Sequence, residues 1–370
     1  IKQEDLLNSS KIYSYMLNKL ELLKIDLMAH GMGVSERAKQ DLTQDGKIPL
    51  SLFEYATTSG IPLRIQDSDI YVNSPFAEDF CKGANWQLDS RDREFFIVKG
   101  GEEQRVEPVS LPSYFNTRWS QFAMSHTDRV RISPIAGCSF SCEFCDLSRT
   151  PEYQKKSVEN LIESVRVALN DPVLPARHVL ISGGNPKPQD ESYMDEVYER
   201  VTKAFDVPVD IMMVTRRDVS YVDKLYSWGV NELSVNLELF NPQIADRMIV
   251  GKNKIGREGY FRFLERAVEV YGRNKVRSIL LVGLEPLEDT LRGVEALAQR
   301  GVSPVLSPFR PSPKTPLAHL SPPTAQQLAE VYEKSREIAE KHKVKLGPSC
   351  IPCHHNTLTF PDGSDFYKYS

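Results

Sequence analysis

The chain has 370 residues, of which 41% are apolar and 26% charged, a composition typical of a globular protein and unlike that of a disordered or fibrous chain. The formal net charge is −4, so the basic excess of a dedicated nucleic-acid binder is missing and we expect no nucleic-acid partner. No run of about 18 apolar residues occurs, so we expect no membrane-spanning segment. The first residues lack a signal-peptide pattern, and we expect a cytoplasmic location.

The first third of the chain mixes helical and strand-like patterns. Apolar residues at helical spacing predict a helix up to about residue 30. Short strand-like pieces at 63–65, 70–72 and 95–98 follow between turn signals. We therefore predict an N-terminal mixed α+β extension or cap at residues 1–125, whose role the sequence does not indicate.

From Arg129 onward, strand-like and helical segments alternate. The predicted strands lie at 130–134, 178–181, 210–214, 232–236, 276–282 and 302–306. The predicted helices lie at 155–169, 191–204, 219–227, 257–271, 287–299 and 324–341.

Six consecutive β/α units indicate a parallel sheet with helical crossovers. We predict an α/β fold, a partial (β/α)6 barrel of the TIM type at residues 126–320, followed by a C-terminal helix and tail at 321–370. In such barrels the functional groups collect at the C-terminal ends of the strands. A doubly wound open sheet is the alternative.

The chemistry of the chain concentrates in three closely spaced cysteines, Cys138, Cys142 and Cys145. Their C-x3-C-x2-C spacing directly follows the first predicted barrel strand, and close thiolates suit an iron–sulfur cluster or zinc. Electron-transfer clusters and structural zinc sites normally take four protein ligands, so three cysteines leave one metal position open. The alternative is a zinc site completed by His354 or a distant cysteine.

This spacing, with Phe144 before the last cysteine, resembles the signature of radical S-adenosylmethionine (radical SAM) enzymes. The resemblance implies that Cys138, Cys142 and Cys145 ligate a 4Fe–4S cluster, whose fourth iron binds the amino and carboxylate groups of S-adenosylmethionine. It implies that reductive cleavage of this cofactor yields a 5′-deoxyadenosyl radical, which abstracts a substrate hydrogen. It further implies an electron donor such as flavodoxin or ferredoxin.

A glycine pair follows the second predicted strand, in Ser182-Gly183-Gly184-Asn185. Glycines allow a backbone to approach a ligand closely. The segment resembles the family's Gly-Gly-Glu-like motif, which holds the amino group of the cofactor. Asn185 replaces the commoner Glu, and its amide oxygen can still accept from an ammonium group. A plain strand–helix turn is the alternative.

Polar residues also follow the third and fourth strands. Thr215 and Arg216 either start a helix with solvated charges or contact a cofactor or substrate carboxylate. Asn236 and Glu238 alternate with apolar residues, so both face one side of their strand. They resemble the Asn-Leu-Glu element of the biotin synthase and maturase-like branch, where the acid contacts the cofactor.

Three further charged residues are candidates by position. Arg247 suits two-point pairing with the methionyl carboxylate of the cofactor, or forms a surface salt bridge. Glu285 resembles the family's fifth-strand motif at the adenine, or caps the next helix. Arg310, in a proline-rich loop after the sixth strand, is a candidate to meet an anionic substrate.

The tail contains Cys350 and Cys353, followed by His354 and Asn356. The two cysteines hold an auxiliary metal or cluster with Cys81, form a redox-active or radical element, or belong to a plug in which His354 and Asn356 touch substrate. His126 and Asp128, just before the first barrel strand, face the cavity or have a structural role. The cysteine-rich extension of peptide-modifying relatives is absent, which favours a small metabolite as substrate.

These features predict a radical SAM enzyme that acts on a small polar metabolite by rearrangement, elimination or decarboxylation. The candidate catalytic residues are Arg310, His354 and Asn356. One alternative is a methylating or sulfur-inserting relative with an auxiliary metal site at Cys350 and Cys353. An alternative of another class is a zinc or iron–sulfur protein without radical chemistry.

Overall fold

A computed structural model describes residues 17–44, 60–149 and 152–363. No helix within these ranges is both long enough and apolar enough to cross a membrane.

The centre of the molecule is a curved sheet of seven strands in the order β15-β14-β13-β12-β11-β8-β7. Six of them are parallel: β8 (Arg129–Ile132), β11 (His178–Ile181), β12 (Val209–Met213), β13 (Glu232–Val235), β14 (Val276–Val282) and β15 (Ser303–Pro308). β7 (Ala123–His126) pairs antiparallel with β8 at one edge. Among the described residues, β15 and β7 do not pair, so the barrel stays open on one side.

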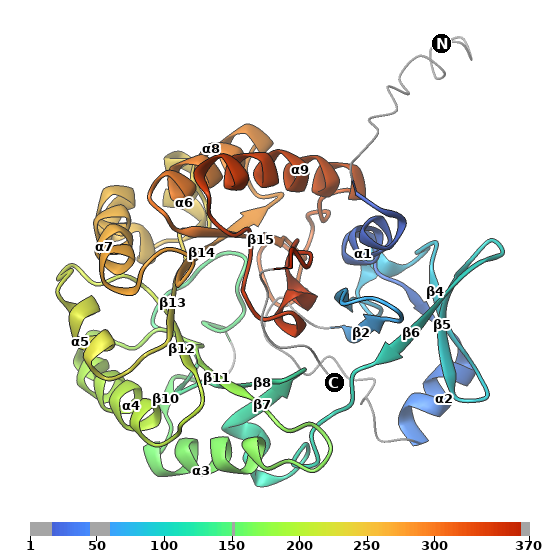
Figure 1. Cartoon of the computed structure of the whole chain (residues 1–370), viewed down its shortest axis with the longest axis horizontal. Coiled ribbons are helices and arrows are strands. Elements are labelled where there is room, and N and C mark those ends of the chain that lie inside the picture. Colours follow the sequence, from blue (N-terminus) through green and yellow to red (C-terminus); the bar gives the residue numbers. More distant parts are fainter. Residues whose placement is uncertain (1–16, 45–59, 150–151, 364–370) are drawn as a thin grey trace.

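Helices ring the outer face of this sheet (Figure 1). They are α3 (Val158–Leu169), α4 (Glu191–Lys203), α5 (Tyr221–Ser227), α6 (Pro242–Met248), α7 (Gly256–Tyr271), α8 (Leu287–Gln299) and α9 (Ala325–His342). In α3, Val158, Leu161, Val165 and Ala168 are buried at helical spacing, so one apolar stripe faces the sheet. Helices on one face of a curved sheet confirm the partial barrel and exclude the doubly wound alternative.

Each of the six predicted strands and six predicted helices overlaps an observed element. Among the seven strands of the barrel sheet and the helices around it, β7 and α6 were not predicted. β7 forms a tight hairpin with β8 through Thr127, which has a positive φ of 57°. α6 has only seven residues and is defined by its start, where the Asn241 side chain accepts from the amide of Ile244. Length does not explain their omission, because the predicted helix α5 also has seven residues and the predicted strand β8 has four, like β7.

The N-terminal region forms a second sheet in the order β1-β4-β5-β6-β2-β3. Its strands are β1 (Gly33–Val34), β2 (Ile61–Ile65), β3 (Tyr71–Ser74), β4 (Gln87–Arg91), β5 (Glu94–Lys99) and β6 (Glu102–Pro108), and its helices are α1 (Lys19–His30) and α2 (Glu36–Gln44). Asn18 and Glu21 form a capping box that starts α1. This region lies beside the open side of the barrel (Figure 1).

The C-terminal tail fills the gap that the open barrel leaves. The amide of Gly347 donates to the carbonyl of Pro304, and the amide of Leu358 donates to that of Leu306, so the tail follows β15. Between them, the short helix η5 (Pro352–Asn356) lies near the centre of the ring (Figure 1). Lys24 of α1 reaches the same segment. Barrel, tail and N-terminal region therefore share one continuous apolar core.

Candidate active site

The three cysteines lie on the loop that follows β8, at the C-terminal end of the barrel strands. Phe144 anchors this loop, because its ring is buried in an apolar cluster with Leu239 and Ile249 against which Cys142 and Cys145 pack. Of the three thiols, that of Cys145 borders the central cavity of the barrel. The loop is therefore held firmly at the mouth of that cavity.

The three thiols differ in their surroundings. The Cys138 sulfur accepts hydrogen bonds from the amides of Asn185, at 3.1 Å, and Phe140, at 3.4 Å. Burial raises the pKa of Cys142 to about 12 and that of Cys145 to about 11. Thiols of this kind stay protonated near neutral pH unless a metal displaces the proton.

The spread of the three thiols distinguishes a cluster from a single ion. Four ligands around one zinc ion lie roughly 3.3–3.8 Å from one another, as tetrahedral bonds of 2.0–2.3 Å require. In the described part of the chain, the possible metal ligands whose donor atoms all lie within 4.8 Å of one another do not include these three thiols. His354 lies in the tail, where its Nε2 faces the carbonyl oxygen of Pro348 at 2.9 Å. The three thiols thus fit a cluster of several metal ions better than a zinc ion completed by His354.

The glycine pair after β11 packs directly against the cysteine loop. A Cβ atom on Gly184 would lie 1.6 Å from the carbonyl oxygen of Gly137, so only glycine fits there. Gly183 has a positive φ of 127°. Asn185 binds the same loop, because its carbonyl oxygen accepts from the amide of Ser139 at 3.0 Å. Ser182, Gly183, Gly184 and Asn185 all border the cavity.

Glu238 and Lys252 form a buried ion pair inside the cavity, with Oε1 and Nζ 2.5 Å apart. Burial opposes the charge on Lys252, but the Glu238 carboxylate raises its pKa overall. The second carboxylate oxygen, Oε2, is buried and has no hydrogen-bond partner in the part of the chain that the structure describes. Such an acceptor is costly unless a ligand supplies a donor.

Asn236 lies beside this pair on the end of β13. Its Oδ1 accepts from the Ser234 hydroxyl at 2.8 Å and from the Ile279 amide at 3.3 Å. Asn236 also borders the cavity, so both polar residues predicted on this strand face the interior. Glu238 has a positive φ of 67°, an uncommon conformation for a residue with a side chain and one often seen at functional sites.

The cavity has a volume of about 350 Å³ and extends through the inside of the barrel. Its upper part borders the cysteine loop, and apolar side chains such as Met212, Val214 and Leu281 form its walls. Its lower part reaches the N-terminal strand ends and the tail, where the lining includes Arg129, Arg131 and the ion-paired Arg277, Asp210 and Glu232. This size suits a small molecule.

Several predicted ligands lie outside this cavity. Thr215 is buried, and its hydroxyl donates to the Arg216 carbonyl at 3.3 Å. The Arg216 guanidinium pairs with Asp195 at 2.8 Å and stacks over the ring of Tyr221. Arg247 is exposed on the last turn of α6. None of these three predicted residues borders the cavity.

Glu285 and Arg310 also have other partners. The Glu285 carboxylate accepts from the amides of Phe240, at 2.9 Å, and Asn241, at 2.8 Å, so it holds the loop after β13. Burial raises the pKa of Glu285. Arg310 is buried and donates to the carbonyl oxygen of Asn73 in β3 at 2.6 Å. Both link neighbouring elements outside the cavity.

The two tail candidates differ in position. Asn356 borders the cavity, and its Oδ1 accepts from the Asn73 side chain at 2.9 Å. His354 is fully buried away from it, and burial lowers its pKa to about 3. His126 borders the cavity and stacks on His355, with ring centroids 5.9 Å apart.

Sequence reasoning gave no role to Lys252 and Arg131. Lys252 follows α6 in sequence, and only the folded loop brings it to Glu238. Arg131 sits on the first barrel strand, in an arginine–apolar alternation with Arg129 that indicates a polar interior face and could have been recognised.

The donor set fits an iron–sulfur cluster with a bound cofactor. Three thiols stand on one loop, Gly184 is packed against that loop, and the buried Glu238 Oε2 lacks a donor within the described residues. Three thiols leave one metal position of a four-iron cluster without a protein ligand, and the Glu238 Oε2 can accept a hydrogen bond from a molecule bound there.

Comparison with known proteins agrees with an iron–sulfur site at the cysteine loop. Residues 132–296 match the family model described as the radical SAM superfamily. The chain is 28% identical over 128 residues to bacteriochlorophyllide c C-7(1)-hydroxylase of Chlorobaculum limnaeum, which covers 34% of this chain and 32% of that protein. The matched part therefore spans about a third of that relative's length.

Solved structures with a similar fold include three of low sequence identity. The hydrogenase maturase HydG from Carboxydothermus hydrogenoformans has a TM-score of 0.46 and 14% identity, covering 59% of this chain and 52% of that one. Methylornithine synthase has a TM-score of 0.47 and 18% identity, covering 59% and 63%. A radical SAM methyltransferase from Sphaerobacter thermophilus has a TM-score of 0.47 and 14% identity, covering 70% and 75%.

Proposed function

The chain belongs to the radical SAM superfamily and is an enzyme that uses a 4Fe–4S cluster and S-adenosylmethionine, and from this premise we propose that it abstracts a hydrogen atom from a small polar metabolite. The observation that carries the proposal is the cavity of about 350 Å³ that begins at the cysteine loop and ends inside the barrel. Its volume suits a small molecule.

The chain's own residues have distinct roles in this proposal. Cys138, Cys142 and Cys145 hold the cluster, and Phe144 keeps their loop in place through its apolar contacts. The Glu238 Oε2 would accept a hydrogen bond from the cofactor, and Lys252 holds that carboxylate in place through their buried ion pair. When bound, the cluster and S-adenosylmethionine supply a 5′-deoxyadenosyl radical that removes a hydrogen atom from the substrate.

The walls of the cavity support the choice of substrate class. Met212 and Leu281 present apolar surface near the cluster loop, which excludes water from a reactive centre. Arg129 and Arg131 border the inner end of the cavity, and guanidinium groups match carboxylate or phosphate geometry. An anionic metabolite would therefore place its charged group at the inner end and its reacting carbon near the cysteine loop.

Rearrangement, elimination or decarboxylation would follow hydrogen abstraction. Hydroxylation is a second candidate outcome, favoured by the 28% identity to a hydroxylase over 128 residues. Mass spectrometry of the converted substrate separates these outcomes, since only hydroxylation adds an oxygen atom. We also propose a small reductant protein such as flavodoxin or ferredoxin as electron donor.

The decisive experiment is anaerobic reconstitution with iron and sulfide, followed by reduction in the presence of S-adenosylmethionine. We expect an iron–sulfur absorption spectrum and the release of 5′-deoxyadenosine. A colourless protein, or a cluster that never cleaves the cofactor, would contradict the proposal and favour a metal-binding protein without radical chemistry.

Two variants refine this experiment. Triple replacement of Cys138, Cys142 and Cys145 by Ala should abolish both the colour and the cleavage. Glu238→Gln should keep the iron content but weaken the binding of S-adenosylmethionine by about tenfold or more, because a charge-assisted hydrogen bond is lost. Equilibrium binding to the reconstituted, unreduced protein measures this effect without any turnover.

A further inference from the structure

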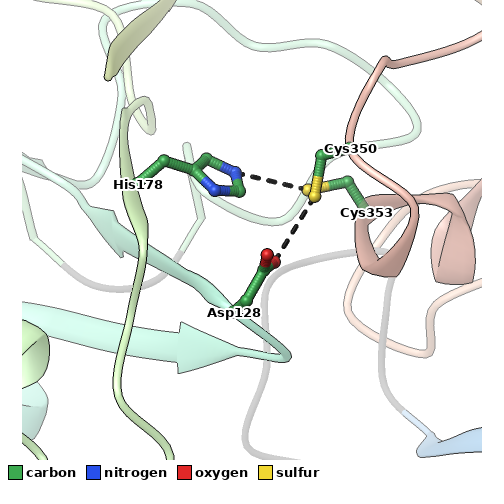
Figure 2. A group of neighbouring side chains, drawn as sticks. All are labelled: Asp128, His178, Cys350 and Cys353. Atoms are coloured by element: carbon green, nitrogen blue, oxygen red, sulfur yellow. Dashed lines mark hydrogen bonds between the residues drawn. The ribbon is translucent and has the colours of Figure 1, made fainter. Parts of the chain in front are cut away.

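Four side chains from separate parts of the chain meet at the opposite end of the barrel from the cysteine loop (Figure 2). Asp128 lies in the turn before β8, and His178 is the first residue of β11. Cys350 and Cys353 come from the tail around η5. All four are buried, and their ligand atoms lie within 4.8 Å of one another.

The contacts within this group have the dimensions of a tetrahedral metal site. The Cys350 sulfur lies 3.4 Å from Oδ1 of Asp128, and the Cys353 sulfur lies 3.5 Å from Nε2 of His178 (Figure 2). Zinc bonds of 2.0–2.3 Å in a tetrahedron place ligand atoms roughly 3.3–3.8 Å apart. Both observed distances match the edges of such a tetrahedron, and the remaining ligand atoms lie within 4.8 Å of one another.

The chemistry of the four donors also selects the ion. Two thiols, one imidazole and one carboxylate are all zinc ligands, and thiolates disfavour magnesium and calcium. Four protein ligands complete the coordination of zinc and leave no open position, which is typical of a structural site. From the geometry and the donor set, we propose that Asp128, His178, Cys350 and Cys353 bind one zinc ion that closes the N-terminal end of the barrel.

The position of the group gives the ion a mechanical role. Asp128 immediately precedes β8 and His178 begins β11, whereas the tail follows the last strand, β15, through Gly347 and Leu358. A metal bound by both sides joins the first and last strands across the gap where β15 and β7 do not pair. Zinc entry displaces the two thiol protons to solvent, replaces the hydrogen bonds within the group by metal–ligand bonds and leaves the covalent bonds of the chain unchanged.

An auxiliary iron–sulfur cluster explains this group less well. A cluster of several irons needs more widely spaced sulfurs than ligand atoms confined within 4.8 Å. The further cysteine that such a cluster would use, Cys81, lies in the N-terminal region beside Gly31 and Pro75. The three cysteines of the loop after β8 stand at the other end of the strands.

The first test is an elemental analysis of the full chain purified without oxygen. We expect about one zinc ion per chain in addition to iron. In the Cys138→Ala, Cys142→Ala, Cys145→Ala variant, iron should fall to background while zinc stays near one per chain. If zinc is lost together with these three cysteines, it was bound at the cysteine loop, and the proposal would be overturned.

The second test removes the proposed ligands in that triple variant. Adding Cys350→Ser and Cys353→Ser should lower the zinc content at least tenfold, whereas the matched control Cys81→Ser should leave it unchanged. Zinc retained by the chain without Cys350 and Cys353, or a disulfide between these two residues in most molecules of the parent chain, would overturn the proposal.

A third measurement does not depend on whether the chain folds after Cys350 and Cys353 are replaced. Cobalt(II) exchanged into the triple variant should show the visible bands of tetrahedral cobalt with thiolate ligands, and Asp128→Asn should shift these bands. An octahedral cobalt spectrum would overturn the proposal. Because these readouts need no cofactor cleavage, failure of the zinc site and failure of the radical chemistry are distinguishable.

Discussion

Gly184 shows how tightly single residues control the candidate active site. Its backbone touches the carbonyl of Gly137, one residue before the first cysteine of the loop, and Asn185 then binds the sulfur of Cys138. The glycine pair therefore supports the cysteine loop directly, as well as bordering the cavity.

We predict that Gly184→Ala lowers the iron and sulfide content of the reconstituted protein several-fold. The new methyl group would lie 1.6 Å from the Gly137 oxygen, so the cysteine loop must shift. Iron and sulfide assays, with circular dichroism to verify the fold, measure the effect. Gly33→Ala is the matched control, because its nearest neighbour would be 3.8 Å away. A full iron content in Gly184→Ala would refute the supporting role.

The Glu238–Lys252 pair gives a second prediction at this scale. Lys252→Met leaves a carboxylate buried without its cation and should lower the free energy of unfolding by roughly 3–5 kcal/mol. The double variant Glu238→Gln, Lys252→Met should recover part of this loss, because no unpaired charge remains. Urea unfolding of the cluster-free chain measures both.

The exposed pair of Lys203 and Glu199 on α4 is the control for this cycle. Lys203→Met should cost only about 0.3–0.5 kcal/mol. An equally small loss for Lys252→Met would contradict the expected cost of leaving the Glu238 side chain buried without its cation.

At the scale of elements, the pairing of α8 with α9 depends partly on charge. Glu295 of α8 accepts from His342, at 2.7 Å, and from Lys341, at 3.0 Å, near the end of α9. These hydrogen bonds lower the pKa of Glu295 to about 2. The group is partly exposed, so solvent screening keeps its contribution small.

We predict that Glu295→Gln lowers the free energy of unfolding by about 0.5–1 kcal/mol near pH 6. A carboxylate with a depressed folded pKa stabilises above its unfolded pKa of about 4.3, and this contribution is lost as the pH falls toward 2. The difference between variant and parent should therefore shrink between pH 5 and pH 3 in thermal unfolding. Glu330→Gln, in a pair within α9, is the control; a constant difference across this range would contradict the assignment.

The barrel elements that the sequence predicted and those that it did not predict differ in the local signals that define them. The six barrel strands end in turn signals and their helices have long apolar stripes, so pattern alone located them. In contrast, β7 forms through its hairpin with β8, and α6 begins at the Asn241 cap. Neither of these features produces a repeating hydrophobic pattern in the sequence. Their positions follow from the neighbours that they pack against.

At the scale of the whole molecule, Lys24 connects the N-terminal region with the C-terminal tail. It projects from α1, is fully buried, and its Nζ donates to the carbonyl oxygens of His354 and Thr359 at 2.8 and 2.7 Å. Burial lowers its pKa well below the usual value. The N-terminal region thereby holds the tail inside the open side of the barrel.

We predict that Lys24→Met loosens the tail while leaving the barrel folded. Two buried carbonyl groups lose their donor, at a cost of about 1–3 kcal/mol each. Hydrogen exchange of residues 350–360 should accelerate at least tenfold, while the barrel strands keep their protection. Lys39→Met, in an exposed pair on α2, should change neither. Unchanged exchange in the tail would show that zinc or packing holds it without Lys24.

The sequence alone determined the series of β/α units and the three-cysteine loop, because both are local patterns: alternation of elements, and thiols close together in one segment. It also predicted that Asn236 and Glu238 share one face of their strand, and both border the cavity. The choice of a partial barrel over a doubly wound sheet came from the placement of the helices on one face. Only the tertiary structure decided that Arg247, Glu285 and Arg310 lie outside the cavity and that Lys252 lies within it. Likewise, only folding brings Asp128 and His178 to Cys350 and Cys353, because residues more than 170 positions apart meet through sheet closure and not through spacing.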